Sequence, residues 1–119
     1  RRVFDDAAET VQLRTHDPLA ALETLYREHG RQHVFFEGGP KLAAAFLKAG
    51  VVDEVIAYLS PTLIGGGKAA VGGLGLRSID QALRFDLVDT LVLLPGDERD
   101  DINLRLTLRP RAATAREEA

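Results

Sequence analysis

The run Glu37-Gly38-Gly39-Pro40 is the part of the sequence best suited to chemistry, because it joins an apolar β-like stretch to a helix-forming one. Two glycines at such a junction allow a tight turn and admit a ligand close to main-chain N–H groups, where the helix dipole favours an anion. Pro40 has no N–H. The candidate donors are the N–H groups of Gly38, Gly39, Lys41 and Leu42. The spacing predicts a phosphate site, and the alternative is that the glycines only let the helix pack on the strand.

Glu37 stands at the end of an apolar run, where an acidic residue is unexpected. A partly buried carboxylate here could accept hydrogen bonds from the amine or amide edge of a heterocycle, or from a sugar hydroxyl. The alternative is a solvated strand terminus. Glu37 is therefore a candidate substrate-binding residue.

A second glycine-rich segment, residues 65–70 (GGGKAA), formally matches a dinucleotide fingerprint. The context is poor, because five residues separate it from the preceding β-like run and Gly72-Gly73 would break a following helix. We interpret it as a flexible connection that could close over a ligand.

Other catalytic chemistry has no support in the sequence. The histidines have no metal-ligand spacing, neither serine sits in a nucleophile elbow, and the absence of cysteine removes thiolate chemistry. These residues are His16, His29, His33, Ser60 and Ser78. We expect no metal site and no catalytic side chain.

Local signals predict the elements that would position the Glu37–Pro40 turn. Asp17-Pro18 starts and Gly30 ends a helix over residues 18–29, and a second helix covers residues 40–48. The expected strands are an edge strand at 10–13, a doubly buried strand at 33–36, a strand at 53–59 and a hairpin of 84–94 with 102–108, with one helical turn at 78–83. The order β-α-β-α-β predicts an α/β sheet with parallel neighbours, followed by a C-terminal antiparallel hairpin.

Composition limits the classes of protein. With 119 residues, 45% hydrophobic and 28% charged, the chain fits one folded domain rather than a disordered segment. A net charge of −3 without a run of like charge argues against nucleic acid as a partner. No apolar run has the roughly 18 residues of a membrane span, and the lack of cysteine fits a reducing compartment, so we expect the cytoplasm. Because the chain begins with Arg1 rather than methionine, we expect a processed product or fragment.

Residues 34–85 (VFFEGGPKLAAAFLKAGVVDEVIAYLSPTLIGGGKAAVGGLGLRSIDQALRF) resemble the C-terminal reductase domain of the bifunctional riboflavin-biosynthesis deaminase/reductase. The resemblance rests on an acid before a glycine pair, a helix of small residues, Gly-Val-Val-Asp-Glu, Pro-x-Leu-Ile-Gly-Gly and a Gly-Leu stretch before the last strands. It covers roughly residues 3–109, assigned as the C-terminal part of a reductase domain of residues 1–109, and it leaves 110–119 as a flexible tail.

The resemblance implies a dihydrofolate-reductase-like mixed sheet flanked by helices. The implied reaction is the NADPH-dependent reduction of the ribosyl group of 5-amino-6-(5-phosphoribosylamino)uracil to the ribityl form. Glu37 matches the family's substrate-contacting acid. The positions that match the NADPH-binding segment are Gly38, Gly39, Pro40, Lys41, Leu42, Ala43, Ala44 and Ala45.

The sequence also departs from that family. Family reductase domains carry about as much chain again before the point that matches Val3, and the zinc deaminase half is missing. We therefore expect a C-terminal portion that is inactive or weakly active alone. The open edge of its sheet and the family's dimers both predict a homodimer. The alternatives are a non-catalytic nucleotide-binding or dimerisation module, or a pterin or dihydrofolate reductase relative.

Overall fold

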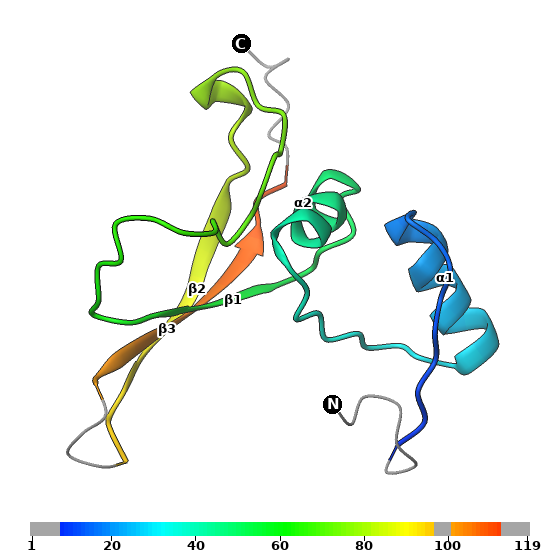
Figure 1. The fold of residues 1–119 in the computed structure, drawn as a ribbon, viewed down its shortest axis with the longest axis horizontal. Helices are drawn as coiled ribbons and strands as arrows, with labels where there is room; N and C mark the ends of the chain where they lie inside the picture. The colour runs from blue at the N-terminus through cyan, green and yellow to red at the C-terminus, as the bar shows by residue number, and fades with distance from the viewer. Residues whose placement is uncertain (1–7, 97–100, 113–119) are drawn as a thin grey trace. The chain divides into compact units, whose positions relative to one another are not determined.

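The computed structural model describes residues 8–96 and 101–112, and these form two α-helices, three β-strands and one 3₁₀ helix (Figure 1). In chain order the elements are α1 (Pro18–His29), α2 (Pro40–Lys48), β1 (Val55–Leu59), the 3₁₀ helix (Ile79–Gln81), β2 (Phe85–Leu93) and β3 (Asn103–Pro110). The chain divides into two compact units, Arg1–Gly38 and Gly39–Ala119, which are described separately.

The first unit contains α1, whose two ends follow the predicted signals. Oδ1 of Asp17 accepts hydrogen bonds from the backbone N–H groups of Leu19 at 3.0 Å and Ala20 at 3.4 Å, and Pro18 occupies the first helical position. At the other end Gly30 adopts a left-handed φ of 63° and its N–H donates to the carbonyl of Tyr26 at 3.0 Å. The prediction of a helix over residues 18–29 is confirmed.

Replacing Asp17 with alanine is expected to lower the free energy of unfolding by about 1 kcal/mol, because two N–H groups lose their acceptor. Thermal denaturation followed by the helical circular dichroism signal measures this change. His16→Ala is the matched control, since His16 is exposed and adjacent to the cap. An equal loss in both variants would contradict a capping role for Asp17.

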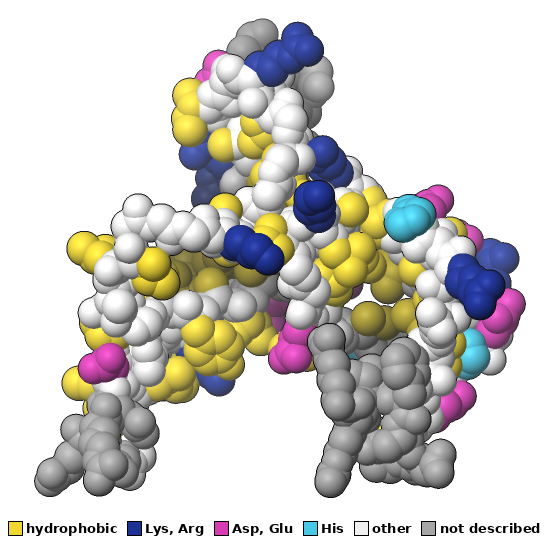
Figure 2. Space-filling view, viewed as in Figure 1, with side chains coloured by type: hydrophobic (Ala, Val, Ile, Leu, Met, Phe, Trp, Pro, Cys, Tyr) yellow, Lys and Arg dark blue, Asp and Glu magenta, His cyan; other side chains and the backbone are white. Residues whose placement is uncertain are grey.

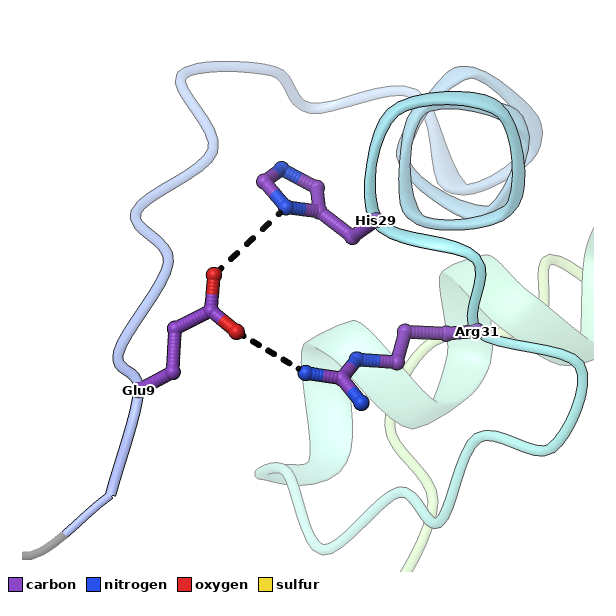
Figure 3. Close-up of polar contacts among 3 residues, drawn as sticks. All are labelled: Glu9, His29 and Arg31. Atoms are coloured by element: carbon purple, nitrogen blue, oxygen red, sulfur yellow. Dashed lines mark hydrogen bonds and ion pairs between the residues drawn. The ribbon is translucent and has the colours of Figure 1, made fainter.

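Glu9 connects the segment before α1 to the C-terminal end of that helix. Its carboxylate lies 3.0 Å from Nη2 of Arg31 and 3.9 Å from Nδ1 of His29, so it sits between the two side chains (Figure 3). The Glu9 side chain is 62% exposed, and ion pairs at such exposure contribute little to stability. These contacts position the segment rather than stabilise the unit strongly.

The second unit contains α2 and the sheet. α2 begins at Pro40, as predicted, and the left-handed Gly50 (φ 68°) lies two residues beyond its end. Among the described residues only Ala44, in the middle of α2, is buried, with 4% of its surface exposed. The core of the second unit therefore lies at the small-residue face of α2.

The sheet has the order β1-β3-β2, with both pairings antiparallel. Ala57 of β1 and Thr90 of β2 lie opposite Leu106 of β3, one on each side. The predicted strand at 53–59 and the predicted hairpin are thereby confirmed, with β1 starting at Val55 and β3 extending through Pro110. All pairings among the described strands are antiparallel, so the parallel neighbours that the sequence predicts are not formed among them.

A β-bulge interrupts the pairing of β2 with β3. Leu87 lies opposite Leu108 and Asp89 lies opposite Thr107, which leaves Val88 as an extra residue on β2. The extra residue moves Asp89 to the same face of the sheet as Arg105, and the two side chains form an ion pair at 4.0 Å.

Large hydrophobic side chains are exposed on both faces of the sheet. Leu87 is 59% exposed on the face that carries Leu106, and Tyr58 is 64% exposed on the opposite face. Hydrophobic side chains accordingly appear at the surface in the space-filling view (Figure 2). A sheet usually buries one face or both, so these faces are available for further packing.

Two predicted strands are corrected by the structure. Residues 10–13 and 33–36 are not strands and take no part in the sheet, and Phe35 is 77% exposed rather than buried. Their residue types favour β structure, but a strand forms only against a partner strand, and β1, β2 and β3 pair only with one another. Of the predicted order β-α-β-α-β, the structure therefore contains both helices and the last strand, but neither of the first two strands.

The remaining predictions concern the loops and the tail. The expected helical turn at 78–83 is confirmed as the 3₁₀ helix. Residues 97–100 of the expected hairpin loop and residues 113–119 of the expected tail lie outside the described residues. No helix in the described part of the chain is long and apolar enough to cross a membrane.

Candidate cofactor-binding turn

The N-terminus of α2 presents backbone donors that the helix itself does not use. Gly39 is the N-cap, with φ −76° and ψ 177°, and its carbonyl accepts the first helical hydrogen bond, from the N–H of Ala43 at 2.9 Å. No side chain caps this end. Because the first N–H groups of a helix have no intrahelical acceptor, those of Lys41 and Leu42 are open to an external one.

The charge and space around this turn favour an anion. The first turn of α2 contains no acidic residue and contains Lys41, which adds a positive charge to that of the helix dipole. A Cβ built on Gly39 would meet no atom within 4 Å, so the backbone here is approachable from outside. Free N–H groups at a helix N-terminus bind anions in general, as P-loop and dinucleotide sites illustrate.

The predicted cofactor-binding residues divide into an exposed part and a packed part. Gly38, Gly39, Lys41 and Leu42 are exposed, Pro40, Ala43 and Ala45 are half-buried, and Ala44 is buried. The exposed part carries the N–H donors, and the alanines fix the helix that presents them. The assignment of these eight residues to a cofactor stays a prediction.

Glu37 lies two residues before the N-cap and is exposed. Of the two alternatives for this residue, the structure has the exposed carboxylate and not the partly buried one, and the preceding segment 33–36 is also exposed. Glu37 and Gly38 end the first unit, and Gly39 begins the second.

A contact that the sequence did not predict joins the glycine-rich loop to α2. The N–H of Gly72 donates to the carbonyl of Pro40 at 3.1 Å. The sequence contained a signal for it, the pair Gly72-Gly73 inside an irregular segment, since glycines in such places often mark a close backbone approach.

Other kinds of site are not supported by the described residues. No group of three or more histidine or acidic side chains among them could hold a metal ion. A cavity of about 370 Å³ lies at one end of the sheet, beside Ser60, Leu94 and Asn103. It is lined by none of the predicted site residues, and the α2 turn remains the candidate because its donors and charge suit a phosphate.

Comparison with known proteins identifies relatives in riboflavin biosynthesis. A family model described as the RibD C-terminal domain matches residues 2–96. The riboflavin biosynthesis protein RibD of Mycobacterium tuberculosis H37Rv is 44% identical over 90 residues, which are 74% of this chain and 26% of that protein. RibD of Escherichia coli K12 is 33% identical over 88 residues, covering 71% of this chain and 24% of that protein.

A solved structure titled Acinetobacter baumannii RibD, form 2, superposes with a TM-score of 0.72 at 33% identity. The match covers 86% of this chain and 27% of that one, so the chain spans about a quarter of the length of the proteins it matches. This likeness confirms the expected dihydrofolate-reductase-like α/β fold class.

Proposed function

Since this chain belongs to the RibD C-terminal domain family, we propose that it is part of a riboflavin-biosynthesis reductase that uses NADPH. The proposed reaction reduces the ribosyl group of 5-amino-6-(5-phosphoribosylamino)uracil to the ribityl form. The observation that carries the cofactor proposal is the uncapped N-terminus of α2, with its open N–H donors, its Lys41 and no acid in its first turn.

The chain's own residues would act by binding and orientation. The N–H groups of Gly39, Lys41 and Leu42 would hold phosphate oxygens of NADPH, and the ammonium of Lys41 would offset their charge. Glu37, close in the chain, would accept a hydrogen bond from the substrate. Bound NADPH supplies the hydride, so the protein's contribution is to hold two molecules in contact, which needs no nucleophilic side chain.

Titration of the chain with NADPH, followed by nicotinamide fluorescence, tests the cofactor proposal. We expect a saturable signal with NADPH and weaker binding of NADH, because NADH offers one phosphate group fewer for charge-assisted hydrogen bonds. A flat titration of a chain shown to be folded by circular dichroism would contradict a cofactor site in this chain. Saturable binding without turnover of the pyrimidine would favour the nucleotide-binding module.

A homodimer is the proposed assembly, and the two edges of the sheet indicate where it would form. The edge strand β2 carries Asp86, Asp89 and a bulge, which are features that discourage pairing with a further strand. The other edge strand, β1, reads Val-Ile-Ala-Tyr-Leu, without charge, bulge or proline. We therefore place the proposed contact between the β1 strands of two copies.

The cytoplasm is the proposed compartment. The support is the absence of cysteine from all 119 residues, which suits a reducing environment.

A further inference from the structure

The glycine-rich loop between β1 and the 3₁₀ helix touches the rest of the second unit at a defined point. Residues 60–71 are exposed without interruption, and Gly72 is the first residue of the loop that is half-buried. At this point the N–H of Gly72 donates to the carbonyl of Pro40, the first residue of α2, at 3.1 Å. The loop is thus attached to the same helical turn that carries the proposed phosphate donors.

The contact leaves room for a methyl group at Gly72 but not for a larger side chain. A Cβ built there would lie 3.5 Å from Cβ of Pro40 and 3.7 Å from its carbonyl carbon and oxygen. A methyl group therefore fits in ordinary van der Waals contact, whereas the γ-carbons of a valine would extend into space that Pro40 already fills. The φ angle of Gly72 is not in the left-handed region, so a substitution tests this space rather than backbone strain.

We infer that Gly72 is a positioning residue for the cofactor, because it fastens the glycine-rich loop to the turn at Gly39–Leu42. This inference rests on the proposed NADPH site. The attachment limits the reach of the loop: Lys68 is four residues before Gly72, so its Cα stays within about 14 Å of the attachment point. Lys68 is the basic residue of the exposed stretch 60–71, and the attachment keeps its charge near a bound phosphate.

The attachment also predicts coupling between the loop and the cofactor. If opening of the Gly72–Pro40 contact weakens NADPH binding, then bound NADPH must oppose that opening to the same extent, because coupling between two equilibria is reciprocal. The same carbonyl, that of Pro40, belongs to the first turn of α2, so loop opening changes the surroundings of the donors directly.

Substitution at two glycines of the same loop separates this role from general loop flexibility. We expect Gly72→Val to weaken NADPH binding by about two- to tenfold, the range that one lost backbone hydrogen bond produces, and Gly72→Ala to bind as the wild type does. Gly66→Val is the matched control, because a Cβ at Gly66 meets no atom within 4 Å and its φ is also outside the left-handed region. Thermal stability of the three variants, measured in parallel without NADPH, is expected to stay close to that of the wild type.

Amide hydrogen exchange at residue 72 of the wild-type chain tests the coupling without a substitution. With NADPH at saturating concentration, exchange of the Gly72 N–H is expected to slow by about the same two- to tenfold, because the coupling is reciprocal. Saturable NADPH binding together with unchanged exchange at Gly72, or equal binding by Gly72→Val and wild type, would overturn the positioning role alone. A flat NADPH titration of the folded wild type would overturn the cofactor proposal and this inference with it.

Discussion

Gly39→Asp is expected to weaken NADPH binding by roughly ten- to a hundredfold, while the chain remains folded. The aspartate would stand at the N-cap of α2, where its carboxylate can accept from the N–H groups of Lys41 and Leu42. Those are the donors proposed for the phosphate, and the new negative charge would also repel it. Loss of a charge-assisted hydrogen bond of about 1.5–3 kcal/mol corresponds to the expected change in affinity.

The structure indicates why this substitution should not damage the fold. Gly39 has φ −76°, which any residue can adopt, and a Cβ there meets no atom within 4 Å. Aspartate is moreover a better N-cap than glycine, and a negative charge suits a helix N-terminus. We expect the melting temperature to stay constant or rise, so that lost affinity cannot be attributed to unfolding.

Gly39→Asn is the matched control for charge. Asparagine caps a helix about as well as aspartate but is neutral. Fluorescence titration of both variants with NADPH is expected to give a smaller loss for asparagine than for aspartate. Equal affinity of Gly39→Asp and wild type would show that the phosphates bind elsewhere.

Ala57→Lys is expected to convert a dimer of the chain into a monomer. In a twofold antiparallel contact between β1 strands, Ala57 at the centre of the strand lies opposite its own copy, and Ile56 lies opposite Tyr58 of the second copy. Lysine at position 57 would place two like charges directly opposite each other, which opposes strand pairing. Lysine on an edge strand is otherwise well tolerated and is a common way of blocking such contacts.

The sheet supplies a control that differs only in the edge that carries the charge. Thr90 of β2 lies opposite the same residue of β3, Leu106, from the other side. The mass is measured by light scattering after size exclusion. We expect the wild type and Thr90→Lys to have twice the chain mass of 12.9 kDa, as dimers. We expect Ala57→Lys to have the mass of one chain. A monomeric wild type, or a dimer that resists Ala57→Lys, would exclude the β1 contact.

Elements set by local interactions could be predicted from the sequence, and elements that need a distant partner could not. Both ends of α1 were predicted because Asp17, Pro18 and Gly30 act within one helical turn of their own positions. The prediction of a strand at 33–36 was wrong, although these residues favour β structure, because a strand also needs a distant partner.

The same distinction applies to the candidate site. The start of α2 at Pro40 follows from neighbouring residues, and it was predicted. The exposure of Glu37 depends on what surrounds the preceding segment, and the contact of Gly72 with Pro40 joins residues 32 positions apart. Sequence patterns alone give no measure of such long-range contacts.

The bulge at Val88 restricts how the length of β2 can change during evolution or engineering. Removal of this one residue would leave Asp89 opposite Thr107 and every later pair of the strand unchanged, because Val88 has no partner on β3. Asp89 would keep its place on the face of Arg105, with which it forms an ion pair. Removal of a paired residue such as Thr90 would instead shift the residues that follow it by one and exchange their faces, so it should be less well tolerated than removal of Val88.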